Sequence, residues 1–180
     1  MANELSALGF KQSSFDIQLT HHASRTTDTA TYSLTGFDAL EFQFAPNPGE
    51  PARPLRAIAS SGELARVMLA LKTVLAAEDE VPVLVFDEVD ANVGGETATA
   101  VGEKMRQIAG THQVLCITHL APVAAHGDAH YVVSKSVVGG RTGSQIELLD
   151  TAGRIEELAR MLGGLTAASR KHAEELLRSR

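Results

Sequence analysis

The chain has 180 residues, of which 44% are hydrophobic, and this is enough to build one sizeable core. Its formal net charge of −6 argues against a generally basic surface for nucleic acids. The single cysteine, Cys116, excludes a disulfide within the chain and is typical of a reducing compartment. The first residues do not form a signal peptide and no apolar run could span a bilayer, so we expect a soluble cytoplasmic protein.

The N-terminal part predicts strands joined by loops. Residues 3–10 are short and apolar at intervals, which fits the end of a longer helix. Residues 15–20 and 39–45 alternate apolar and polar side chains, and each stretch predicts a half-buried strand. Between them, residues 21–35 are rich in His, Ser, Thr and Asp and predict an exposed loop. Residues 47–54 are rich in Pro and predict a turn-rich connector.

A helix is predicted to start at Ser60. Ser60 followed three residues later by Glu63 forms a capping-box pattern. Apolar residues then recur at helical spacing to about Ala77. The free backbone amides and the positive dipole end of such a helix start can bind a terminal phosphate. By itself, however, this pattern is more typical of an ordinary capped helix.

The most informative stretch is residues 81–95. An apolar run ends in Asp87 and Glu88, followed by Asp90, and it predicts a parallel-sheet strand buried on both faces. Because the carboxyl ends of such strands face the ligand crevice, Asp87 and Glu88 should lie at the rim of a site. A strand-end Asp can hold hydrated Mg²⁺, and the adjacent Glu can activate water for attack on a phosphoryl group. A polar turn that merely closes a strand would give the same pattern.

A second buried strand at 113–118 ends in Thr118 and His119, after a helix predicted at 97–108. A histidine there, beside an acid-tipped strand, can reach a phosphate oxygen. We expect four further elements: a short helix at 120–125, a hairpin of 130–135 with 144–149, and helices at 155–162 and 167–177. The alternation of strands and helices predicts an α/β fold, with a mostly parallel sheet flanked by helices.

Other chemistries fit the sequence less well. Cys116 should point into the core, which leaves His119, His126 and His130 at spacings that match no usual zinc site. Burial argues equally against Cys116 as a nucleophile. The chain also contains no G-x-x-x-x-G-K-[ST] loop, so a nucleotide site built from it alone would lack its main phosphate grip and its lysine.

Taken in order, these features resemble the C-terminal half of an ABC-type ATPase head. Residues 60–63 resemble the signature motif, residues 83–88 resemble Walker B, residues 91–95 lie where the D-loop would be, and His119 lies where the switch histidine would be. More narrowly, four blocks resemble the RecN family, the bacterial SMC-like proteins of DNA double-strand-break repair. These blocks are residues 58–72, 86–95, 112–120 and 157–164.

The resemblance implies the end of a coiled coil at residues 1–12 and a C-terminal head lobe at 13–180. In that family a separate N-terminal lobe carries Walker A, and two heads enclose two ATP molecules. Asp87 would then hold Mg²⁺ through water, Glu88 would be the general base and His119 would sense the γ-phosphate. The nucleotide-binding residues implied are Ser60, Ser61, Gly62, Glu63 and Asp90.

The resemblance also implies what the chain works with. Its partners would be the Walker A lobe, a second head in an ATP-dependent homodimer, and DNA through the full-length protein, with no membrane partner. The protein would be cytoplasmic and associated with the nucleoid. The isolated chain should not hydrolyse ATP, because Walker A is absent.

Two positions depart from the family pattern. Ser61 stands where the signature usually has its first Gly, and its Cβ can hinder close backbone approach to a phosphate. Gly94 stands where the D-loop of transporters and SMC heads has Asp. Two alternatives stay open: a non-catalytic scaffold or binding lobe, and a stand-alone Mg²⁺-dependent, toprim-like phosphotransfer domain with Asp87, Glu88 and Asp90 as metal ligands.

Overall fold

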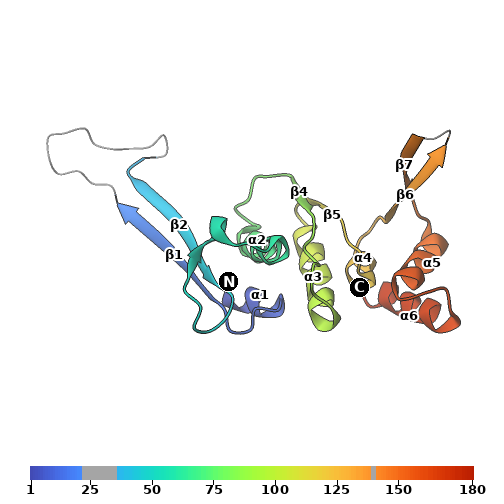
Figure 1. Cartoon of the computed structure of the whole chain (residues 1–180), viewed down its shortest axis with the longest axis horizontal. Helices are drawn as coiled ribbons and strands as arrows, with labels where there is room; N and C mark the ends of the chain where they lie inside the picture. Colours follow the sequence, from blue (N-terminus) through green and yellow to red (C-terminus); the bar gives the residue numbers. More distant parts are fainter. Residues whose placement is uncertain (22–35, 139–140) are drawn as a thin grey trace.

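A computed structural model describes residues 1–21, 36–138 and 141–180 (Figure 1). In chain order the elements are α1 (Ala2–Ala7), β1 (Ser14–His21), β2 (Asp38–Ala45), β3 (Arg53–Pro54), the 3-10 helix η1 (Leu55–Ala57), α2 (Ser61–Leu75), β4 (Val83–Phe86), α3 (Gly95–Ile108), β5 (Gln113–Cys116), α4 (Ala121–Ala125), β6 (Tyr131–Val138), β7 (Arg141–Leu148), α5 (Thr151–Met161) and α6 (Ala167–Arg178). A helix or strand occurs at each predicted place. The predicted loop at 21–35 lies outside the described residues, except for His21 at the end of β1.

The N-terminal strands form a three-stranded antiparallel sheet in the order β1-β2-β3. At the base of the long β1–β2 hairpin, Phe44 is buried and meets the ring of Phe10 edge-on, with 5.2 Å between centroids. Farther along, the hairpin extends away from the helices (Figure 1) and Ile17, Leu19 and Leu40 are exposed. The predicted half-buried strands are therefore present, but their apolar side chains are buried only near the base.

The centre of the chain is a parallel strand pair covered by helices. β4 pairs with β5 from Val83 opposite Gln113 to Phe86 opposite Cys116, and α3 connects the two strands. Leu84 and Phe86 point into the main core, together with buried residues of α2 and α3. The parallel strands joined by a helix confirm the predicted α/β fold.

The prediction that the β4 strand is buried on both faces is wrong for this chain. Val83 and Val85 on β4 are exposed. Leu115 on β5 and Ile117, directly after β5, are exposed on the same face of the sheet. The physical reason is that α2 and α3 both pack on the opposite face, against Leu84 and Phe86. Within the described residues, this sheet has only its two strands and cover on one side.

The C-terminal part combines the antiparallel β6–β7 hairpin with the packed helices α4, α5 and α6. Arg154 of α5 is buried and donates hydrogen bonds to the carbonyl oxygens of Ala125, Gly127 and Asp128, which fastens α5 to the end of α4. After α5, Gly163 and Gly164 have φ values of +108° and +138°, where side chains are disfavoured. None of the helices in the described ranges is long and apolar enough to cross a membrane.

Cys116 tests the packing of β5, because it is the single thiol of the chain. Burial, reinforced by the nearby Asp90 and Asp87 carboxylates, raises the pKa of the Cys116 thiol to about 12. Since the thiolate is the reactive form, we expect very slow reaction with an aromatic disulfide reagent at pH 8. The same chain in urea should react rapidly, because an unfolded cysteine has a pKa of about 8.5. Rapid reaction of the folded chain would contradict the burial.

Candidate functional site

The carboxyl ends of β4 and β5 lie side by side. Their parallel register continues beyond the strands, because the amide of Ile117 donates to the carbonyl oxygen of Phe86 at 2.9 Å. The residues that follow are Asp87 and Glu88 after β4, and Thr118 and His119 after β5. The expectation that the acidic and histidine-bearing strand ends share one edge is therefore confirmed. The roles given to these residues stay predictions.

A buried carboxylate ties the two strand ends together. Asp90 is 2% exposed, and its Oδ2 accepts hydrogen bonds from the Thr118 hydroxyl at 2.5 Å and the His119 amide at 3.0 Å. The His119 Nδ1 lies 3.3 Å from the same oxygen, while the imidazole side chain is 71% exposed. The Thr118 hydroxyl also accepts from the Leu120 amide at 3.0 Å. This network fixes the backbone beneath an exposed imidazole.

The start of α2 packs directly on the acidic loop that follows β4. Ser60 caps the helix by accepting from the Glu63 amide at 3.3 Å, as the sequence predicts. The next hydroxyl, on Ser61, donates to Glu88 Oε2 at 2.5 Å. Gly62 is buried, and a Cβ added there would lie 2.9 Å from Ala91 Cβ and 3.1 Å from the Glu88 carbonyl oxygen. The glycine is thus needed for close approach within this chain.

Arg66 joins the same two segments from the inside. It is 7% exposed, and its guanidinium donates to the carbonyl oxygens of Val89 at 3.5 Å and Ala91 at 3.0 Å. The guanidinium also lies over the Phe10 ring, 5.2 Å from its centroid. Desolvation by burial lowers the pKa of Arg66. Nothing in the sequence pattern marks Arg66 out from other helix arginines, so sequence reasoning missed it.

The acidic loop itself has an unusual backbone. Glu88 and Asn92 both have φ values of 58°, in the left-handed region that residues with a Cβ rarely adopt. Between them, Val89 is fully buried, and the Ala91 amide donates to the Glu88 carbonyl oxygen at 3.0 Å. Strained residues of this kind persist where the surroundings hold them, and they concentrate at functional sites.

The arrangement of acids bears on metal binding. Asp87 is exposed at the sheet edge, whereas Asp90 points inward to Thr118 and His119. In residues 1–21, 36–138 and 141–180, no group of three His, Cys, Asp or Glu side chains could hold a metal ion. The geometry therefore does not match a toprim-like site in which Asp87, Glu88 and Asp90 share metals.

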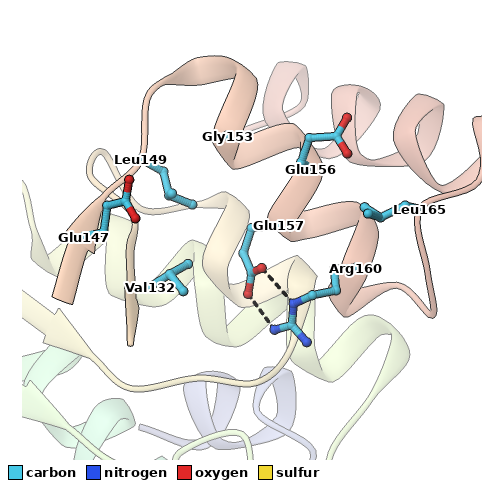
Figure 2. Close-up of a pocket in the computed structure, with 8 residues that line it drawn as sticks. All are labelled: Val132, Glu147, Leu149, Gly153, Glu156, Glu157, Arg160 and Leu165. Atoms are coloured by element: carbon cyan, nitrogen blue, oxygen red, sulfur yellow. Dashed lines mark hydrogen bonds and ion pairs between the residues drawn. The ribbon is translucent and has the colours of Figure 1, made fainter. Parts of the chain in front are cut away.

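A separate hollow of about 220 Å³ lies beside α5 (Figure 2). Figure 2 shows Glu157 paired with Arg160 through two contacts, of 2.6 and 2.8 Å. Glu156, also at the rim, is paired with Arg170 at 2.7 and 3.0 Å. None of the residues that line this hollow belongs to the edge formed by β4 and β5. The candidate site is therefore the strand edge and not the hollow.

Comparison with known proteins finds extensive similarity to one group. The chain is 48% identical over 177 residues to the DNA repair protein RecN of Treponema pallidum, covering 97% of this chain and 31% of that protein. It is 50% identical over 155 residues to RecN of Deinococcus radiodurans, covering 86% and 27%. The chain thus spans about a third of the length of these curated relatives. No family model matches the chain.

Solved structures show the same fold at lower sequence identity. The Smc head domain with a coiled coil and joint from Pyrococcus yayanosii has a TM-score of 0.55 at 19% identity, covering 97% of this chain and 28% of that chain. The Smc head domain with an extended coiled coil from Pyrococcus furiosus has a TM-score of 0.53 at 21% identity, covering 88% and 36%.

The close approach at Gly62 can be tested by adding one methyl group. Because the atoms around its Cβ position are two backbone oxygens and Ala91 Cβ, they cannot move aside cheaply. We expect Gly62→Ala to lower the free energy of unfolding by about 1–3 kcal/mol, as overpacking does. The control is Gly143→Ala, where no atom beyond the neighbouring residues lies within 4 Å of the added Cβ. Urea unfolding measures the stability of both variants. Equal losses of stability would contradict the close packing around Gly62.

The Asp90 network gives a second prediction. Asp90→Ala leaves the Thr118 hydroxyl and the His119 amide without their acceptor. We expect it to lower the free energy of unfolding by about 1–3 kcal/mol, because two partly buried donors lose their acceptor. The exposed neighbour provides the control, because Asp87→Ala should change stability by less than about 0.5 kcal/mol. If urea unfolding shows Asp87→Ala to be more destabilising than Asp90→Ala, the structural role of the buried Asp90 carboxylate is disproved.

Proposed function

We propose that this chain, which belongs to the RecN family of DNA repair proteins, is the C-terminal lobe of an ABC-type ATPase head and completes an ATP site together with an N-terminal Walker A lobe. The observation that carries the proposal is the meeting of three segments at one sheet edge. Asp87 and Glu88, the Thr118–His119 strand end and the start of α2 all lie there.

Each side chain has a place in phosphoryl transfer. Glu88 is the general base that takes a proton from the attacking water, and its carboxylate is exposed at the edge of the sheet. Asp87 would hold Mg²⁺, which would neutralise charge on the phosphates. His119, whose amide is held by Asp90, presents an exposed imidazole to the γ-phosphate.

The uncovered face of the parallel pair supports a partner lobe. Val83, Val85, Leu115 and Ile117 expose between 42% and 64% of their surface on one continuous side of β4 and β5. Exposed apolar patches of this kind mark interfaces. We assign the face to the Walker A lobe, which would also bring the phosphate-binding loop that the 180 residues lack.

The α2 start would act on a second head. Its free amides and the positive end of the helix dipole suit a γ-phosphate bound in the partner head, with Ser60, Gly62 and Glu63 at the contact. ATP would then drive head dimerisation while the full-length protein engages DNA.

Residues 1–12 would lead from a coiled coil into the head, since Leu5 and Leu8 of this segment pack in the main core.

Steady-state ATP hydrolysis tests the composite site. We expect no turnover by this chain alone and turnover when it is mixed with an N-terminal Walker A lobe. Glu88→Gln should lower the turnover of the mixture about a hundredfold, since a general base typically contributes at least that factor. Glu103→Gln, an exposed acid on α3, should leave turnover unchanged and serves as the control.

Two results would contradict the proposal. Turnover by the chain alone would point to a stand-alone phosphotransfer enzyme. An inactive mixture, with both lobes folded and associated, would favour a scaffold lobe whose motif residues are idle.

A further inference from the structure

Ser61 and Glu88 make a direct side-chain contact within one chain. The Ser61 hydroxyl donates to Glu88 Oε2 at 2.5 Å, across 27 residues of sequence. Hydrogen bonds to an ionised carboxylate are shorter and about twice as strong as neutral ones. The family signature usually has glycine at this position, and glycine has no side chain to make the bond. The contact therefore depends on the serine at position 61.

The segments that carry the two residues pack closely against each other. Gly62 packs on Ala91 and on the Glu88 carbonyl oxygen, as described above. Arg66 holds the carbonyl oxygens of Val89 and Ala91 from within the core. The start of α2 and the acidic loop therefore form one packed unit, and Ser61 stays within reach of Glu88.

The Glu88 side chain is the exposed part of this unit. Its backbone is fixed at φ 58°, next to the fully buried Val89, but its carboxylate is exposed. A long exposed side chain samples several rotamers, and catalysis loses the fraction of time spent in the wrong ones. A bond from Ser61 to Oε2 selects one arrangement and leaves Oε1 to accept a proton from water.

We propose that Ser61 is a positioning residue that orients the Glu88 carboxylate of its own chain. The inference rests on the proposed function, in which Glu88 is the general base. It differs from a role in which Ser61 contacts the phosphate bound by a second head. A hydroxyl has one proton to donate, so while Ser61 holds Glu88 its proton is not given to a phosphate oxygen.

A double-mutant cycle in the mixed two-lobe head separates these roles. Ser61→Ala should lower kcat about tenfold, the loss expected for one hydrogen bond to a charged group, with KM for ATP unchanged. Ser61→Gly should behave like Ser61→Ala, and Ser61→Thr should restore turnover because it keeps the hydroxyl. In a Glu88→Gln background, Ser61→Ala should cause no further loss.

The outcomes distinguish the inference from the function on which it rests. A rise in KM, or an equal loss from Ser61→Ala in the Glu88→Gln background, overturns the positioning role but leaves the ATPase intact. Turnover that Glu88→Gln leaves unchanged overturns the proposed function and this inference with it. In the chain alone, NMR should detect a nuclear Overhauser effect between the Ser61 β protons and the Glu88 γ protons. Its absence overturns the contact whatever the turnover.

Discussion

The parallel pairing of β4 with β5 is the constraint on which the site depends. Its register places Phe86 opposite Cys116, so the residues that follow each strand emerge at the same edge. Asp90 can then reach Thr118 and His119 across 28 and 29 residues of sequence. A shift of one residue would turn Leu84 and Phe86 away from the core and would separate Asp90 from its donors, because successive strand residues point to opposite faces. Burial of Leu84 and Phe86 and the position of the site are thus set by the same register.

A second contact joins the start of α2 to the acidic loop after β4. Gly62 lets α2 approach the acidic loop, and Arg66 then satisfies carbonyl oxygens that this turn leaves without strand partners. Burying a guanidinium costs free energy, which the two carbonyls and the Phe10 ring partly offset. Because Phe10 follows α1, Arg66 contacts both the N-terminal segment and the acidic loop.

Hydrophobic periodicity was sufficient to predict the helices, the strands and the shared edge of β4 and β5. It could not reveal that one face of β4 is uncovered, because Val83 and Val85 are as apolar as Leu84 and Phe86. Nor could it reveal the hydrogen-bond partners of Asp90 and Arg66, because each partner lies more than 20 residues away from its residue in sequence. The resemblance placed Asp90 with the nucleotide ligands, which stays a prediction, whereas its environment in this chain is buried. Local patterns report on the nearest helix or strand, and these contacts depend on packing between elements.

The substitution at Ser61 changes what the signature segment can do. A glycine there would offer only its backbone, which suits close approach to a phosphate from a second head. Serine brings a Cβ that limits such approach, but it also brings a donor that reaches the Glu88 carboxylate. Gly62, the next residue, is packed against Ala91 and can offer a second head only its backbone amide. In this chain Ser61 is the exposed residue at the helix start, with Ser60 half-buried beside it, and the Ser61 hydroxyl is bonded to the acidic loop. Contact with a second head would then fall mainly to Ser60, to the backbone amides and to the helix dipole.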